Sequence, residues 1–302
     1  MSPARIGLLC LSLSLLISAD LGAEEVRDLV LVAGQSNAVG YDAYASELPA
    51  DPGDEKVLFW WRCGDPPPDV HDSTSTRQWT SLRPQPIGDP IPKINASGDT
   101  ASGLKRQYGN FGKPGGGFGP EMGFARSWRK NADTPLAIVK VAFSGTSMAT
   151  DWNPDDAGPG GACYRALIEE SRAAISSAKE RGITLRLRAL IWVQGESDAN
   201  AEAAPRYEEA LGTMIARLRE DLEAPEFVAL LAVNTRFGDG KNPHVPVIVA
   251  AQKSLAEKDP LCRYVDTAGA ETLGPRHTHF TAAGTLEVGR RFATALADFK
   301  KR

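Results

Sequence analysis

The sequence predicts a three-layer α/β domain built on a parallel sheet, because strand-like and helix-like segments alternate along most of the chain. The expected strands are short apolar runs that end in polar or glycine-containing turns; they are 29–33, 57–61, 136–143, 185–193, 227–233 and 262–265. The expected helices repeat their apolar residues every three or four positions; they are 122–129, 164–178, 207–218, 247–257 and 281–299. Strands that alternate with helices are typical of a parallel sheet covered on both faces.

The composition is that of an ordinary globular protein. The chain has 302 residues, of which 42% are hydrophobic and 24% are charged, and its formal net charge is −4. It contains no block of Lys and Arg, which argues against nucleic acid as a partner. It shows no internal repeat, so we expect a single domain over residues 24–302 after an N-terminal signal.

Residues 1–23 have the features of a signal peptide. Arg5 supplies a positive charge, residues 6–17 form an apolar and serine-containing run, and the small Ala23 precedes two glutamates. The run is too short to span a bilayer. The alternative is a disordered segment or a buried N-terminal strand. Because no other stretch is long and apolar enough to cross a membrane, we expect an exported mature protein, secreted or periplasmic, without a membrane span.

The cysteines and histidines give no sign of a metal or cofactor. Removal of the signal would also remove Cys10 and leave Cys63, Cys163 and Cys262, which are too widely spaced for a disulfide framework or a Cys-x-x-Cys metal motif. One disulfide with a free thiol is possible in an oxidising compartment, and two or three buried free thiols are the equal alternative. The four histidines form no metal-binding motif, so we predict neither metal nor cofactor.

The segment 41–119 is long, irregular and rich in proline and glycine, with a strand expected only at 57–61. A loop region of this length normally shapes a binding site or is disordered. Trp60, Trp61 and Trp79 lie in it and favour an ordered region. Their rings suit either stacking against sugars or packing in the core, and for most of them we expect core packing.

Ser36 lies in the most informative turn of the chain. The apolar run 29–33 ends in Gly34-Gln35-Ser36-Asn37, at the carboxyl end of an expected parallel strand, where ligands and chemistry collect in open α/β sheets. A serine at this place could act as a nucleophile whose own N–H binds an oxyanion. The alternative is an ordinary turn or a helix cap.

Three further motifs follow at the same expected edge of the sheet. They are Ser144-Gly145-Thr146-Ser147, Gln194-Gly195-Glu196-Ser197-Asp198 and His277-Thr278-His279-Phe280-Thr281. Acyl transfer needs a nucleophile, a base within hydrogen-bond reach and donors aimed at the developing oxyanion. Ser36, a histidine and the N–H groups of Ser36 and Gly145, with the side-chain amide of Gln194, would supply these roles.

With these motifs the chain resembles the SGNH-type hydrolases, specifically the sialate O-acetylesterase-like carbohydrate esterases. The matching blocks are 34–37, 118–121, 144–147 with 151–152 after it, 194–198 and 279–284. The resemblance spans about residues 29–297. It implies a flavodoxin-like parallel sheet of about five strands, with Ser36 as nucleophile and His279 as base. It further implies oxyanion donors from Ser36, Gly145 and Gln194, and no metal.

One position departs from the family pattern. Many members carry an aspartate three residues before the histidine, where it orients the imidazole, but this chain has Arg276. Loss of such an acceptor costs about 10⁴ in rate in other Ser-His-Asp enzymes. Another carboxylate or a backbone carbonyl would then have to replace it, and Glu196 is the nearest candidate by motif. The remaining carboxylates considered are Asp198, Asp266 and Glu271.

His277 competes with His279 for the role of base. We favour His279, because the Phe-Thr-Ala-Ala-Gly that follows it, residues 280–284, matches the register of the family. Arg276 is expected on the surface, although it could also bind an anionic sugar.

The sequence therefore predicts an exported serine esterase that removes O-acetyl groups from a carbohydrate, either sialic acid or a polysaccharide, through an acyl-enzyme. One alternative is a short-chain esterase of broader specificity. The other is a catalytically silent carbohydrate-binding relative, which would fit Arg276. The joint presence of Ser36, Gly145 and Gln194 favours an enzyme.

Overall fold

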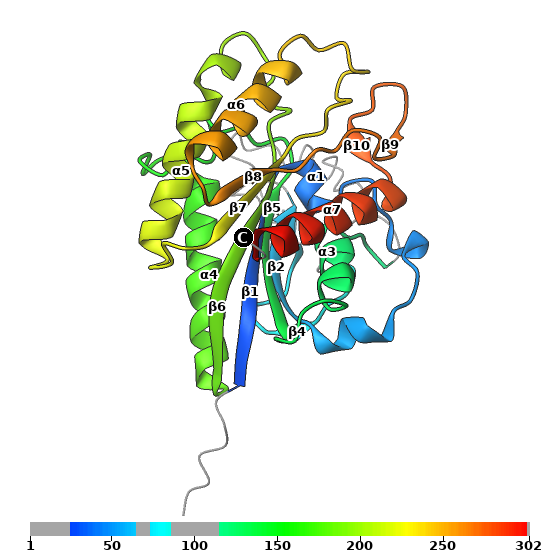
Figure 1. The fold of residues 1–302 in the computed structure, drawn as a ribbon, viewed down its shortest axis with the longest axis vertical. Helices are drawn as coiled ribbons and strands as arrows, with labels where there is room; N and C mark the ends of the chain where they lie inside the picture. The colour runs from blue at the N-terminus through cyan, green and yellow to red at the C-terminus, as the bar shows by residue number, and fades with distance from the viewer. Residues whose placement is uncertain (1–24, 65–72, 86–114, 301–302) are drawn as a thin grey trace, which may run out of the picture.

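The computed structural model describes residues 25–64, 73–85 and 115–300 (Figure 1). The signal peptide expected at 1–23, with Cys10, lies outside these residues, as does much of the proline-rich and glycine-rich segment between 64 and 115. The cleavage and export predictions therefore stay predictions.

A central sheet with six parallel strands forms the middle layer. In spatial order these strands are β2 (Leu58–Gly64), β5 (Leu136–Phe143), β1 (Glu25–Gly34), β6 (Ile183–Val193), β7 (Val228–Ala232) and β8 (Cys262–Tyr264). The last five have the flavodoxin-type order expected from the resemblance. The sheet is larger than the expected five strands, because β2 extends it beyond β5.

Short antiparallel pieces complete the strands. They are β3 (Ser73–Thr74) and β4 (Thr80–Ser81), both paired with β2, and a separate hairpin of β9 (Thr272–Leu273) with β10 (His279–Phe280). The hairpin places β10 directly before the last helix of the chain, so its position matters for the site described below.

Helices cover both faces of the sheet, as the alternating pattern predicts (Figure 1). One face carries α4 (Ala162–Glu180), α5 (Tyr207–Asp221) and α6 (Val245–Lys258), and the other carries α1 (Ser36–Val39), α3 (Glu121–Trp128) and α7 (Ala282–Lys300). Short 3₁₀ turns lie at Ala45–Glu47, Pro52–Lys56, Pro159–Gly161 and Ala204–Arg206. The three-layer α/β/α architecture is confirmed.

The core divides into two layers because side chains alternate across a strand. In β1, Val30 and Val32 face the α3 and α7 layer, while Leu29 and Leu31 face the opposite layer. Both faces of the sheet are thus filled with apolar side chains. Polar groups can gather at the carboxyl ends of the strands.

The tryptophans that the sequence left open between sugar stacking and core packing belong to the core. Trp60 and Trp61 lie on β2 and are 1% and 2% exposed. Trp79 packs edge-on against Trp60 and donates its indole N–H to the carbonyl of Ala174 at 3.1 Å. The rings of Trp60 and Trp61 therefore offer no exposed face to a sugar, whereas Trp79 is partly exposed and packs against the core.

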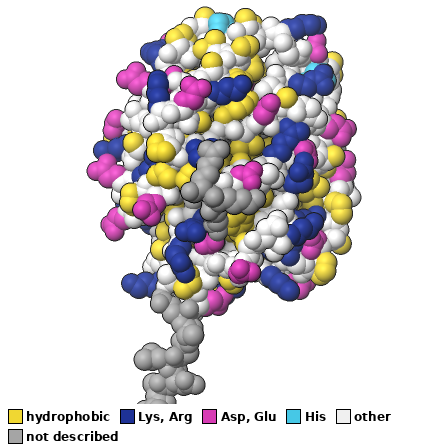
Figure 2. Space-filling view, in the orientation of Figure 1, with side chains coloured by type: hydrophobic (Ala, Val, Ile, Leu, Met, Phe, Trp, Pro, Cys, Tyr) yellow, Lys and Arg dark blue, Asp and Glu magenta, His cyan; other side chains and the backbone are white. Residues whose placement is uncertain are grey.

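The remaining expectations concern cysteines, charge and membranes. Cys63, Cys163 and Cys262 are buried thiols, which matches one of the two arrangements considered. Acidic and basic side chains are interspersed over the face drawn in Figure 2. Within the described ranges, no helix has the length and hydropathy that a membrane span requires.

Candidate active site

Three neighbouring strands bring their terminal loops to one edge of the sheet. Gly34 at the end of β1 pairs with Ala142 of β5 on one side and with Val193 of β6 on the other. Gly34 has a φ of +133°, and a Cβ there would lie 2.2 Å from the carbonyl oxygen of Val193. Only glycine fits this close approach, which lets the chain turn directly into α1 and places Ser36 at the edge.

The structure brings Ser36 and His279 together. Nε2 of His279 lies 3.0 Å from Oγ of Ser36, within the predicted limit of about 3.5 Å for a nucleophile and its base. His279 reaches this position from β10, which lies beside α1 just before α7. Ser36 is 6% exposed.

Asp42 holds the other nitrogen of His279. Its Oδ2 lies 2.7 Å from Nδ1, and the ring of Tyr41 packs against the imidazole with 4.6 Å between ring centroids. Both groups are mostly buried, with the side chain of His279 15% and that of Asp42 19% exposed. Sequence reasoning missed Asp42, which lies outside every motif it used. The only feature of the sequence that could have indicated Asp42 is its place in the turn that follows the serine.

The assignment of Glu196 as the orienting carboxylate is therefore corrected. Its Oε1 instead accepts hydrogen bonds from Nδ2 of Asn37 at 2.7 Å and from the backbone N–H of Asn234 at 3.1 Å. Burial raises the pKa of Glu196 above its usual value. Its carboxylate thus joins the nucleophile turn to the loop after β7.

Asn37 and Asn234 extend this connection to the histidine. Oδ1 of Asn37 accepts from the N–H of Phe280 at 3.1 Å, and its Nδ2 also donates to the carbonyl of Thr278 at 3.2 Å. Nδ2 of Asn234 donates to the carbonyl of His277 at 2.6 Å. The backbone on both sides of His279 is therefore fixed by two asparagines that Glu196 holds in place.

The other carboxylates considered for the orienting role also lie elsewhere. Asp198 accepts from the backbone N–H of Met148 in the loop after β5. Asp266 is exposed and accepts from the N–H of Ala268. Glu271 is exposed, and its backbone carbonyl accepts from Thr281. None of the three carboxylates bonds to His279 in the part of the chain that the structure describes.

His277 is turned away from Ser36. Its Nδ1 lies 2.7 Å from Oγ1 of Thr272, and its Nε2 lies 3.0 Å from the guanidinium of Arg236 and 3.4 Å from Asp239. Its neighbour Arg276 is exposed, as expected. The two histidines of the motif therefore have separate environments.

We expect the two histidines to differ sharply when each is replaced with alanine. His279→Ala should lower kcat/KM for p-nitrophenyl acetate by about 10³-fold or more, because a serine enzyme without its base loses most of its rate. His277→Ala should change it by less than about tenfold, since the side chain that it removes contacts Thr272, Arg236 and Asp239 and not Ser36. Equal losses in both purified variants, at similar thermal stability, would contradict the assignment of His279.

The backbone N–H groups of Ser36 and Gly145 are the two oxyanion donors that the sequence predicts. Neither the N–H of Ser36 nor that of Gly145 donates to another described residue. Gly145 is exposed, has a φ of +73°, and would meet nothing within 4 Å of an added Cβ. The space beside its Cα is thus free of other atoms of the described residues.

Gln194 does not reach this position, which corrects its expected role as a side-chain donor. It is fully buried, and its Nε2 donates to the carbonyl of Thr146 at 3.1 Å and to Oδ2 of Asp198 at 2.5 Å. Both of its amide hydrogens are used, as burial of a polar group requires. Gln194 therefore anchors the loop that carries Gly145.

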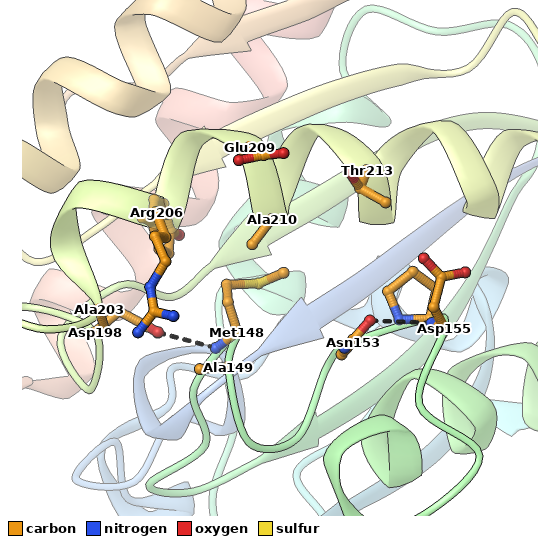
Figure 3. A pocket seen from close by; sticks show the side chains of 12 residues that line it. Met148, Ala149, Asn153, Asp155, Asp198, Ala203, Arg206, Glu209, Ala210 and Thr213 are labelled. Atoms are coloured by element: carbon orange, nitrogen blue, oxygen red, sulfur yellow. Dashed lines mark hydrogen bonds between the residues drawn. The ribbon is translucent and has the colours of Figure 1, made fainter.

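Asp198, to which Gln194 also bonds, anchors the same loop through Met148 (Figure 3). Its carboxylate accepts from the N–H of Met148 at 3.0 and 3.1 Å, and burial raises its pKa. A cavity of about 360 Å³ lies between this loop and α5. Neither Ser36 nor His279 lines it, so the cavity is separate from the reacting groups. Across the described ranges, no cluster of three or more His, Cys, Asp or Glu side chains could hold a metal.

A serine, a histidine and a carboxylate lie in hydrogen-bond sequence at the carboxyl edge of a parallel sheet between two helical layers, an arrangement that serine esterases share with other serine hydrolases. The family model described as carbohydrate esterase, sialic acid-specific acetylesterase, matches residues 26–298. The chain belongs to this family and is a carboxylic ester hydrolase of the carbohydrate acetylesterase type. The resemblance stated from the sequence motifs is confirmed.

Solved structures share the fold. A protein from Arabidopsis thaliana is 19% identical with a TM-score of 0.63, and the match covers 90% of this chain and 98% of that one. NanS is 16% identical with a TM-score of 0.58, covering 92% and 99%. A carbohydrate acetylesterase from Xanthomonas citri is 17% identical with a TM-score of 0.54, covering 89% and 55%. None of the curated proteins compared is a significant match.

Proposed function

We propose that this esterase removes O-acetyl groups from a carbohydrate through an acetyl-enzyme on Ser36, with His279 as base and Asp42 as orienting carboxylate. The observation that carries the proposal is the continuous line of hydrogen bonds from Asp42 through His279 to Ser36, with distances of 2.7 and 3.0 Å. The same line of groups activates the serine in unrelated hydrolases.

In the first half of the reaction, Oγ of Ser36 attacks the acetyl carbonyl carbon and its proton passes to Nε2 of His279. The carbonyl oxygen becomes an oxyanion, which the N–H groups of Ser36 and Gly145 stabilise. When the tetrahedral intermediate collapses, the bond to the sugar oxygen breaks, and the imidazolium returns its proton to that oxygen. The products of this half are the free sugar hydroxyl and acetyl-Ser36.

Water then completes the cycle. His279 removes a proton from the water as the water attacks the acetyl carbon. When the second intermediate collapses, the bond from that carbon to Oγ of Ser36 breaks, the imidazolium returns its proton to Oγ, and acetic acid leaves. Asp42 keeps Nδ1 of His279 as the protonated nitrogen and stabilises the imidazolium in both halves. His279 thus accepts a proton and returns it in each half of the reaction. The only net release of a proton comes from the ionisation of acetic acid.

The proposed substrate is an acetylated carbohydrate, either a sialic acid or a polysaccharide, outside the cytoplasm after removal of residues 1–23. Family membership supports the carbohydrate class. Release of acetate from a panel of O-acetylated sialic acids, xylans and pectins would identify the substrate, and the N-terminal sequence of the exported protein would test cleavage after Ala23. A panel without any acetate release would contradict the carbohydrate assignment.

We expect a steep preference for acetyl over longer acyl groups. Forcing extra methylenes into a small acyl site costs about 1–3 kcal/mol of packing strain, on the scale measured in protein cores. This corresponds to a loss of about 5- to 150-fold in kcat/KM from p-nitrophenyl acetate to the butyrate. Equal or rising activity towards butyrate and octanoate would favour the broad short-chain esterase instead.

A further inference from the structure

A buried ion pair lies beneath the turn that carries Ser36. Lys140 interrupts the apolar strand β5, and its ammonium is fully buried 3.0 Å from Oε1 of Glu121. The same ammonium donates to Oε1 of Gln85 at 2.7 Å and to the carbonyl of Val39 at 2.8 Å. All three hydrogens of the ammonium therefore have acceptors, and one acceptor is the last residue of α1.

Glu121 is held equally firmly. Its Oε1 also accepts from the N–H of Gly119 at 2.7 Å and from Nε2 of Gln85 at 3.1 Å. Glu121, Lys140 and Gln85 are each 0% exposed. The three side chains form a buried polar group, which we call the brace, between β5 and the start of α3; Oε2 of Glu121 has no hydrogen-bond partner among the described residues.

The segment 118–121 also packs directly against α1. A Cβ on Gly119 would lie 2.3 Å from the carbonyl oxygen of Ala38 and 2.7 Å from Nζ of Lys140. On the other side, Gly40 has a φ of +84°, and a Cβ there would lie 1.8 Å from the carbonyl oxygen of Phe118. The Phe-Gly-Pro-Glu block, to which the proposed reaction gives no role, thus forms the support of the nucleophile turn.

The turn supported in this way carries two of the reacting groups. Helix α1 is a single turn, and the N–H groups of Gly40 and Tyr41 both close onto the carbonyl of Ser36. Asp42 follows at once. A shift of the end of α1 would therefore change the positions of Ser36 and Asp42 relative to His279, which arrives from a different part of the chain.

Stability alone gives little reason for such a pair. Burying two charges costs desolvation free energy, and well-packed apolar side chains of similar volume are often as stabilising or more so. We propose that Glu121 and Lys140 are positioning residues for the esterase, and that they fix the turn 36–42 so that Ser36 and Asp42 meet His279 together. This inference rests on the proposed function of these three residues.

The double variant Lys140→Met/Glu121→Gln tests the proposal. It removes the donor to Val39 without leaving a charge unpaired, so the protein is expected to fold. We expect kcat for p-nitrophenyl acetate to fall by about 10- to 100-fold, because displacements of about 1 Å in a reacting group cost this much. KM should stay within about twofold, since no proposed substrate contact changes.

The matched control is another buried ion pair outside the turn. Arg126 and Asp54 lie 2.6 Å apart with side chains 14% and 12% exposed, and neither bonds to residues 36–42. Arg126→Met/Asp54→Asn should lower the thermal stability but keep kcat. Two results would overturn the positioning role. In the first, Lys140→Met/Glu121→Gln keeps kcat within about twofold of wild type. In the second, its kcat falls no further than that of the control variant when the two have the same thermal stability.

Hydrogen exchange on the unaltered protein decides the matter if the double variant does not fold. The amides of Gly40 and Tyr41 should exchange as slowly as those of β5, because a braced turn opens only with the sheet. Exchange as fast as in the exposed loop 149–150 would overturn the brace. Hydrogen exchange needs no turnover. It therefore still tests the brace if the wild-type protein has no esterase activity and the proposed function is wrong.

Discussion

Ser36→Ala is expected to abolish esterase activity, with kcat for p-nitrophenyl acetate at least about 10⁴-fold below wild type. The variant removes the one hydroxyl that lies 3.0 Å from Nε2 of His279. It removes no contact that supports α1, because the turn is closed through the backbone carbonyl of Ser36. The melting temperature should therefore stay at the wild-type value.

A serine on the adjacent loop provides the control. Oγ of Ser147 pairs with Oγ1 of Thr150 at 2.7 Å and has no role in the proposed reaction. Ser147→Ala should keep most of the activity. Wild-type turnover by Ser36→Ala protein, prepared from a host without other esterases, would remove Ser36 as nucleophile.

Most of the sheet was predictable from local pattern. The strand expected at 136–143 has the observed bounds of β5, and those expected at 185–193 and 227–233 overlap β6 and β7. Strand β1 begins earlier than its apolar run, because Val26, Arg27 and Asp28 also pair with β6. Arg27 and Asp28 are polar, so a search for apolar runs does not include them in the strand.

The place of β2 could not be predicted from local pattern. Residues 57–61 look like a strand, but a strand reveals its partner only through contacts distant in sequence. Residues Leu58–Gly64 pair in parallel with Ala137–Phe143, and this pairing builds the sixth parallel strand. It also explains the burial of Trp60 and Trp61, which lie on opposite faces of the sheet.

The site was predictable where a motif coincides with the end of a strand. Ser36, Gly145 and His279 are placed at the edge by backbone position alone. The roles expected of Glu196 and Gln194 depended instead on where a side chain points, and burial decided this. Both are almost fully enclosed, and Oε1 of Glu196 and Nε2 of Gln194 bond to neighbouring loops and not to His279 or the predicted oxyanion donors.

Asp42 illustrates what sequence reading cannot reach. The contact between Asp42 and His279 joins residues 237 positions apart, and the turn around Asp42 has neither strand nor helix periodicity. With Arg276 at the usual acidic position, the carboxylate comes from the nucleophile's own turn. The histidine is thus oriented by the segment that also carries the serine.

Asp42→Asn is expected to lower kcat by about 10³- to 10⁴-fold with little change in KM, as loss of the orienting carboxylate does in other serine hydrolases. An amide is similar in size to the carboxylate, so the turn should keep its fold. Its neutral oxygen cannot stabilise an imidazolium as a carboxylate 2.7 Å from Nδ1 can. Steady-state kinetics with p-nitrophenyl acetate and thermal melting of the same preparation measure both effects.

Two further amide variants separate Asp42 from the other carboxylates. Asp239→Asn changes an acid that faces His277 and should leave kcat near wild type. Glu196→Gln keeps an oxygen that can accept from Asn37 and from the N–H of Asn234, so we expect a loss below about tenfold, the scale of one weakened hydrogen bond to a charged group. Collapse of activity in Glu196→Gln, together with wild-type kcat in Asp42→Asn, would return the orienting role to Glu196. The opposite ranking would mean that the serine and its orienting carboxylate act from one turn, and that the histidine alone comes from elsewhere in the chain.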